Sequence, residues 1–301
     1  MFEPWIYLTV LAAFLLNIRT LVQKKLTGQL SPVGATSTRF IYGIPVVLTY
    51  VWLLYTYGGF EVPHMQAIFA LWAAAGGLAQ LVGTVLLLKV LQQTNFFVGT
   101  AFARTSSIQT AIVGFVLLAE AISFLAGVGI VIGVAGSMLL AWNQPQWGWE
   151  HLKRVLSSRS AILGLTSGLL FGFGAVCYRG ASLSLDSHIW MNAAWTLMVV
   201  VVWQTVMVCG YMLYKESGEM SEVLARWRPG CIVGLTGIVS SIGWFTAMTY
   251  QKAAYVMALG QIEAIFTYLT SVLVFRETVL RRQWLGSGLI SIGIVVLIVA
   301  T

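Results

Sequence analysis

Long apolar runs separated by short polar segments make up most of the chain. Each run approaches the roughly 20 residues that a helix needs to cross a membrane. They predict spans at about 5–22, 33–55, 68–88, 96–118, 122–142, 161–183, 190–213, 231–250, 254–275 and 284–300. The pattern therefore predicts an all-α polytopic membrane protein with ten transmembrane helices.

The longest polar interruption, 143–160, lies near the centre of the sequence and divides the spans into five plus five. An offset of 157 residues superposes Glu120 on Glu277, Gly129 on Gly286 and Gly136 on Gly293. Because each half has an odd number of spans, the second half must enter the membrane from the opposite face. Such inverted repeats are typical of secondary transporters, whose binding site lies near the midplane. We predict two inverted halves, 1–142 and 161–301, joined by the loop 143–160.

Composition excludes an ordinary soluble enzyme, because 58% of the residues are hydrophobic and only 9% are charged, against roughly 25% charged in soluble domains. The net charge of +7 sits in short loops, which indicates membrane topology and no nucleic-acid partner. The expected partners are the lipid bilayer and a small-molecule substrate. The glycines of the fifth span suggest close packing within a monomer, with a homodimer as the alternative.

Catalytic constellations are missing from the sequence. It contains no HExxH or GxSxG motif, and its one aspartate, Asp186, lies near a predicted helix end. The three histidines lie outside the span interiors. We therefore expect no enzyme, no metal site and no cofactor.

Each half resembles the EamA-type repeat of the drug/metabolite transporter superfamily. The residues that carry the resemblance in the first half are Ser31-Pro32, Arg39-Phe40, the stretch 87–94, Glu120, Gly129, Gly133 and Gly136. Those in the second half are the stretch 247–250, Glu277, Gly286, Gly288 and Gly293. The resemblance implies two EamA-like repeats and a transporter of small metabolites, often amino acids or organic anions, in the bacterial inner (plasma) membrane. Such transporters are typically exporters or exchangers.

Arg104 is the strongest candidate for a binding residue. It lies about 12 Å down the fourth span, near the middle of a core about 30 Å thick, where a cation needs a partner or a wet cavity. The repeat offset superposes it on Gln261, and Glu263 follows closely; both are further candidates for substrate binding. Arg104 and Glu263 either form an ion pair that joins the fourth and ninth spans, or Arg104 binds the negative group of a substrate. The resembling family often has proline midway along these spans, where this chain has Ser107 and Ala264.

Arg39, near the start of the second span, either snorkels to the interface or faces inward as a second anion-binding donor. Polar and aromatic residues within the other spans are further candidates for substrate contact: Gln80, Tyr178, Trp195 and Trp244. Arg179 is expected at the membrane interface.

These residues predict a secondary active transporter that exports or exchanges a small organic metabolite, anionic or an amino acid, by alternating access around a midplane cavity. Proton-coupled efflux of cationic or amphipathic compounds, with Glu263 as the carboxylate, is the alternative, followed by a membrane sensor or channel. The loops on one side carry twelve Lys and Arg residues, whereas the other side has two, Arg179 at the end of a span and Lys252. The positive-inside rule places both termini outside, whereas the resemblance implies cytoplasmic termini.

Overall fold

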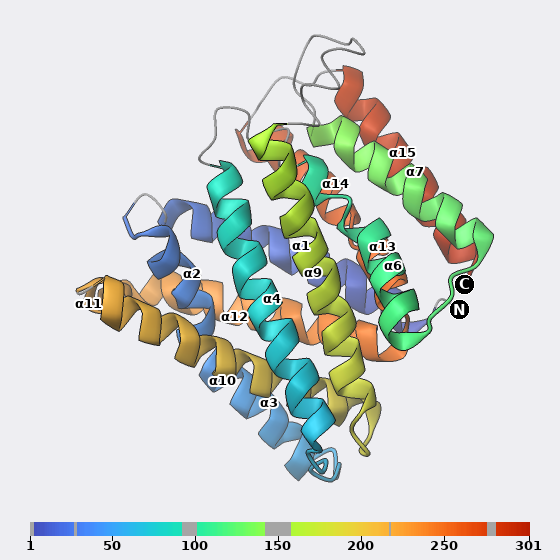
Figure 1. Cartoon of the computed structure of the whole chain (residues 1–301). Coiled ribbons are helices and arrows are strands. Elements are labelled where there is room, and N and C mark those ends of the chain that lie inside the picture. Colours follow the sequence, from blue (N-terminus) through green and yellow to red (C-terminus); the bar gives the residue numbers. More distant parts are fainter. Residues whose placement is uncertain (1–2, 27–28, 92–100, 142–157, 217, 276–280) are drawn as a thin grey trace. The chain divides into compact units, whose positions relative to one another are not determined.

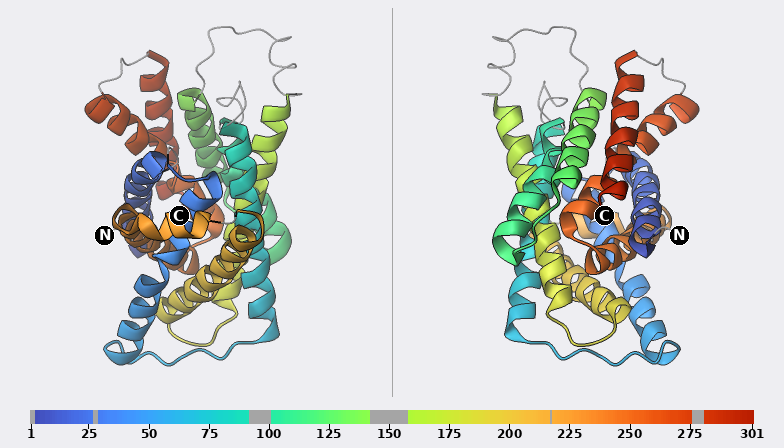
Figure 2. Two further views of the ribbon diagram at one scale, coloured as in Figure 1. Left: turned by 90° about the vertical axis from the view of Figure 1, so that its left-hand side faces the viewer. Right: turned by 90° about the vertical axis from the view of Figure 1, so that its right-hand side faces the viewer.

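The computed structural model describes residues 3–26, 29–91, 101–141, 158–216, 218–275 and 281–301. Every regular element among them is an α-helix (Figures 1 and 2), so the all-α class is confirmed. In this part of the chain, seven helical segments are long and apolar enough to cross a membrane. Two further apolar helices, Phe124–Leu140 and Trp284–Val299, are shorter.

The helices of the first predicted half are α1 (Pro4–Leu26), α2 (Pro32–Ile41), α3 (Ile44–Thr56), α4 (Ala67–Leu91), α6 (Ser106–Leu118) and α7 (Phe124–Ala141). Those of the second half are α9 (Arg159–Leu183), α10 (Ile189–Lys215), α11 (Glu219–Ala225), α12 (Trp227–Tyr250), α13 (Ala253–Leu259), α14 (Ile262–Phe275) and α15 (Arg281–Val299).

Three of the predicted spans are interrupted. The second divides into α2 and α3 at Tyr42 and Gly43, just before Pro45. A proline inside a helix removes a backbone donor and its ring clashes with the preceding turn, which explains a break there. The fourth span is broken at 104–105 and the ninth at 260–261. These three spans were predicted as single runs because hydropathy records apolar length and not helix continuity.

The chain forms two compact units, and each unit takes helices from both predicted halves. The first unit comprises Met1–Leu78 and Cys177–Gln251, and the second comprises Ala79–Val176 and Lys252–Thr301. Both α4 and α9 contribute to each unit.

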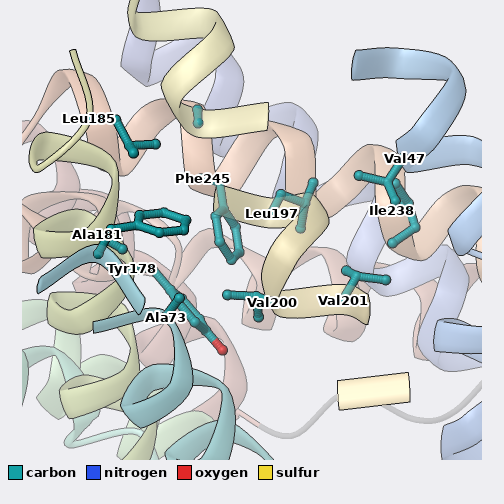
Figure 3. Close-up of a cluster of buried hydrophobic side chains, with 12 residues drawn as sticks. Val47, Ala73, Tyr178, Ala181, Leu185, Leu197, Val200, Val201, Ile238 and Phe245 are labelled. Atoms are coloured by element: carbon teal, nitrogen blue, oxygen red, sulfur yellow. The ribbon is translucent and has the colours of Figure 1, made fainter. Parts of the chain in front are cut away.

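A cluster of buried side chains from α3, α4, α9, α10 and α12 forms the core of the first unit (Figure 3). Tyr178 and Phe245 stack within it, with ring centroids 4.5 Å apart. Elsewhere in the unit α1 packs closely on α12, because a Cβ added to Gly243 would lie 2.9 Å from the Cβ of Ala12. The hydroxyl of Ser240 donates a 2.7 Å hydrogen bond to the carbonyl of Ala12 and joins the same two helices.

In the second unit, α7 and α15 lie side by side (Figure 1). An added Cβ on Gly129 would lie 2.9 Å from the carbonyl oxygen of Gly293, and one on Gly136 would lie 2.7 Å from that of Gly286. The repeat offset pairs Gly129 with Gly286 and Gly136 with Gly293, so each glycine contacts the counterpart of the other. Reciprocal contacts of this kind are the mark of a two-fold relationship.

The contact also runs antiparallel, since the residue number rises along α7 as it falls along α15. This is the arrangement expected for two inverted copies of one helix. Gly129 and Gly136 of the fifth span are therefore covered within the chain by α15.

Candidate functional site

Arg104 and Gln261 lie at the breaks of the fourth and ninth spans, which coincide within one residue under the repeat offset. The amide of Arg104 donates to the carbonyl of Ala101 (3.1 Å) and that of Gln261 to the carbonyl of Ala258 (3.2 Å). Both bonds span three residues, as in a 3₁₀ turn, and such turns within a helix often mark functional hinges. The fold therefore places a polar side chain at the same point of each repeat.

Arg104 and Glu263 form an ion pair, which is one of the two alternatives that the sequence predicts for them. The Nη1 atom of Arg104 lies 3.8 Å from Oε2 of Glu263, and the two side chains are 34% and 22% exposed. This distance is near the limit for an ion pair, and both groups remain accessible. An ion pair at this distance between accessible groups contributes little to stability.

Gln261 is enclosed, with only 4% of its surface exposed. Its Nε2 donates to the hydroxyl of Ser107 (3.0 Å), and its Oε1 accepts from the hydroxyl of Ser137 (2.7 Å). Ser107 in turn donates to the carbonyl of Met257 (3.0 Å). Both ends of the amide thus tie the break in the ninth span to α6 and α7.

Arg39 faces α12 within the first unit, which favours the inward-facing alternative over snorkelling. Its Nη2 donates a 2.9 Å hydrogen bond to the hydroxyl of Ser241 in α12, which is 3% exposed. Its Nε is buried and has no acceptor among the residues that the structure describes. The α2 helix positions Arg39 in its last turn, where a cation complements the helix dipole.

The aromatic candidates belong to the core of the first unit. Tyr178 is 4% exposed and donates to the carbonyl of Gly76 (3.1 Å). Trp195 and Trp244 pack against the same buried cluster. Gln80 lies on the α4 segment of the second unit and is half-buried.

The predicted binding residues divide between the units. Arg39, Tyr178, Trp195 and Trp244 belong to the first unit, and Gln80, Arg104, Gln261 and Glu263 to the second.

Sequence reasoning overlooked Arg19 and did not identify the partners of Arg179. Arg19 lies inside the first predicted span, and the rule that singled out Arg104 would have found it. Arg179, which the sequence predicts at the membrane interface, binds the end of a neighbouring helix. Its Nη1 donates to the carbonyls of Met248 (2.6 Å) and Gln251 (2.7 Å) at the end of α12, where a cation satisfies the last carbonyls and the helix dipole.

The family described as the EamA-like transporter family matches residues 3–142 and 158–299. The chain belongs to this family. The two matched segments cover both halves of this EamA-like transporter, so the resemblance seen in the sequence is confirmed. Membership identifies a multi-pass membrane protein of a transporter family.

No curated protein matches the chain. A solved structure described as "Crystal structure of protein" is similar to it, with 14% sequence identity and a TM-score of 0.66. The similarity covers 100% of this chain and 99% of the other. At this identity the likeness shows the fold alone.

Proposed function

We propose that this EamA-like transporter is a secondary active transporter of the plasma membrane that exports or exchanges a small organic metabolite carrying a negative charge, amino acids included. The charge balance inside the membrane supports this. The predicted spans contain four arginines, Arg19, Arg39, Arg104 and Arg179, but one acidic residue, Glu263. A cation in the bilayer interior requires compensation, and an excess of arginines favours an anionic ligand.

Partners of three of these arginines are described above. Arg179 caps the carbonyl end of α12, and Arg104 faces Glu263. Within the part of the chain that the structure describes, Arg39 donates to the neutral hydroxyl of Ser241. The observation that carries the proposal is this inward-facing Arg39, because no acidic residue occurs in any predicted span of its unit.

In the proposal, Arg39 and Arg104 bind negative groups during alternating access across the ten predicted spans. An anion that competes for Arg104 releases Glu263, and departure of the anion restores the pair. Gln261 acts as a positioning residue at the break. Tyr178, Trp195 and Trp244 of the first unit and Gln80 of the second are proposed as further residues that contact the substrate.

Counterflow in proteoliposomes tests the proposal. Vesicles preloaded with unlabelled glutamate, succinate or lactate are diluted into the labelled compound, and a carrier accumulates label by exchange. We expect saturable exchange of at least one of these anions, lost in Arg39→Gln and retained in Arg228→Gln, which removes an exposed arginine from α12. Uptake that is linear and does not depend on preloading would indicate a channel and contradict the proposal.

Efflux of a cationic compound in exchange for protons is the second candidate. It is favoured by Glu263, because a membrane-embedded carboxylate can alternate between a proton and a cation. The nearby Arg104 opposes it, since an adjacent cation stabilises the charged carboxylate. Ethidium efflux driven by a pH gradient and abolished in Glu263→Gln would favour this candidate over the anion carrier.

A further inference from the structure

Arg19 of α1 and Arg39 of α2 converge on one glycine of α12. A Cβ built on Gly237 would lie 3.1 Å from Cδ of Arg19 and 3.1 Å from Cγ of Arg39. Both side-chain stems therefore lie against the same point of the helix surface. The two residues are 20 positions apart in sequence, on different helices, so nothing in the local pattern brings them together.

Gly237 makes this convergence possible. A contact of 3.1 Å is tighter than side-chain carbons normally adopt, so a side chain at this position would push both stems away. One turn further along α12, Ser241 accepts the hydrogen bond from Arg39 and itself donates to the carbonyl of Gly237 (2.8 Å). Gly237 and Ser241 of α12 thus form a small, polar surface that the two arginine side chains contact.

The helices around this point contain no carboxylate. None of the helices of the first unit that could cross the membrane (α1, α2, α3, α4, α9, α10 and α12) contains Asp or Glu. The acidic residues near the ends of these helices have other contacts, since Glu216 and Glu219 accept from Ser31, and Glu222 pairs with Arg226. Arg39, whose Nε has no acceptor in the described part of the chain, therefore favours an external anion as its counter-charge, and the stem of Arg19 lies against the same surface.

The chemistry of arginine specifies the class of anion. Its planar guanidinium presents donors in a fork that matches the two oxygens of a carboxylate or phosphate. The Nε of Arg39 is buried and has no acceptor in the described part of the chain, so one edge of its fork still lacks an oxygen. A carboxylate or phosphate placed there supplies it.

We propose that Arg19 and Arg39, positioned by Gly237 and Ser241, together bind a single oxyanion, the carboxylate or phosphate group of the transported molecule. The inference rests on the proposed function and adds to it the residue Arg19 and the two-arginine recognition of one group. Arg19 and Arg39 act here as binding residues, and Gly237 as a positioning residue.

Calorimetric titration of the purified full-length protein in nanodiscs of neutral lipid tests the proposal. The probes are succinate, glutamate and inorganic phosphate, titrated into wild type, Arg19→Gln, Arg39→Gln and the double variant. Because both arginines hold one group, each single variant should weaken binding at least about tenfold. The double variant should be little weaker than either, which is the non-additivity expected of residues that share a partner.

Two further variants keep the test independent of folding defects. Arg19→Lys retains the charge but not the fork, and should weaken binding as well. Gly237→Ala should weaken binding while the protein stays folded, since the added methyl meets flexible stems. Gly210→Ala is the matched control, because nothing lies within 4 Å of an added Cβ there.

The outcomes distinguish failure of the two-arginine site from failure of the transporter proposal. Anion binding or exchange that is unchanged in Arg19→Gln and Arg19→Lys overturns the two-arginine site and leaves the transporter proposal standing. If none of the anions binds or exchanges in the wild type, both fail. Binding that occurs only when the nanodiscs contain anionic lipid would identify a lipid phosphate as the occupant and overturn the assignment to a transported molecule.

Discussion

The hydroxyl of Ser137 in α7 donates a 2.7 Å hydrogen bond to the amide oxygen of Gln261, at the break between α13 and α14. Together with the bond from Gln261 to Ser107, it joins three helical segments of the second unit through one buried amide. A polar group in such a place holds a helix break in one conformation, because each unmade bond would leave a buried dipole unsatisfied.

We therefore expect Gln261→Leu to destabilise the protein. The change leaves the two serine hydroxyls without their partner, which costs about 1–3 kcal/mol and lowers the midpoint of thermal unfolding in detergent. Gln66→Leu serves as the control, because Gln66 is exposed before α4. An unchanged midpoint combined with lost substrate affinity would instead make Gln261 a direct substrate contact.

The Arg104–Glu263 pair predicts opposite effects on anion affinity. Glu263→Gln removes the internal competitor for Arg104 and should tighten anion binding about fivefold, equivalent to about 1 kcal/mol for a partly exposed pair. Arg104→Gln should weaken binding.

The double variant Arg104→Gln/Glu263→Gln should unfold at a higher temperature than either single variant, because no charge is left without its partner. Calorimetric titration measures the affinities, and thermal unfolding measures the stabilities. Weaker anion binding in Glu263→Gln would show that the carboxylate helps to bind the ligand and is not its competitor.

Close packing of α7 on α15 predicts a sharp difference between two glycines of the same helix. Gly293→Val should destabilise the protein by about 1–3 kcal/mol, because its added Cβ would lie 2.6 Å from the amide nitrogen of Gly133. Gly288→Val should have little effect, since nothing lies within 4 Å of its added Cβ. Thermal unfolding of the two variants side by side is the measurement. Equal losses would mean that the helices do not approach at Gly293.

A contact between two connections of the first unit predicts a dependence on pH. The backbone N–H of His64 donates to Asp186 (3.0 Å) and the imidazole lies 3.3 Å from the same carboxylate. The backbone bond from His64 holds the pKa of Asp186 below its usual value. The carboxylate is therefore charged, and the contact present, at neutral pH. It is lost only as the pH falls through the lowered pKa, below about pH 4.

Limited proteolysis of the connection between α3 and α4, compared at pH 7 and pH 3 with an acid-tolerant protease, measures this loss. Cleavage should increase at pH 3 in the wild type. In Asp186→Asn it should already be raised at pH 7 and change little with pH. A wild-type connection that opens between pH 7 and pH 5 would contradict the assignment to Asp186.

Orientation in the membrane gives a further prediction. Arg179 and Lys252, the two basic residues on the sparsely charged side, donate to backbone carbonyls of Met248 and Ala121, respectively. The twelve basic residues in the loops of the opposite side are expected to decide the orientation. The positive-inside rule then places both termini outside. A C-terminal reporter that is active only in the cytoplasm should be inactive in this fusion, and an active fusion would support the orientation implied by the family.

The sequence by itself determined the membrane class, the all-helical architecture and the two-fold repetition. Apolar length is a local property that each segment carries regardless of its neighbours. The offset that pairs Gly129 with Gly286 was also visible, because glycines and charges are conspicuous in apolar segments. Charges are equally conspicuous there, so the sequence alone predicts Arg104 and Glu263 as partners, and the structure places them 3.8 Å apart.

Only the tertiary structure decided the breaks at 104–105 and 260–261, the enclosure of Gln261 and the convergence of Arg19 and Arg39 on Gly237. Each depends on groups distant in sequence, such as Ser137 for Gln261 and Gly237 for the two arginines. Hydropathy averages over such contacts, so it records a polar residue in a span but not its partner. In a membrane interior the partner determines the role, because bonding to the protein's own backbone or side chains leaves a polar group structural, whereas an unfilled donor edge is where a ligand can bind.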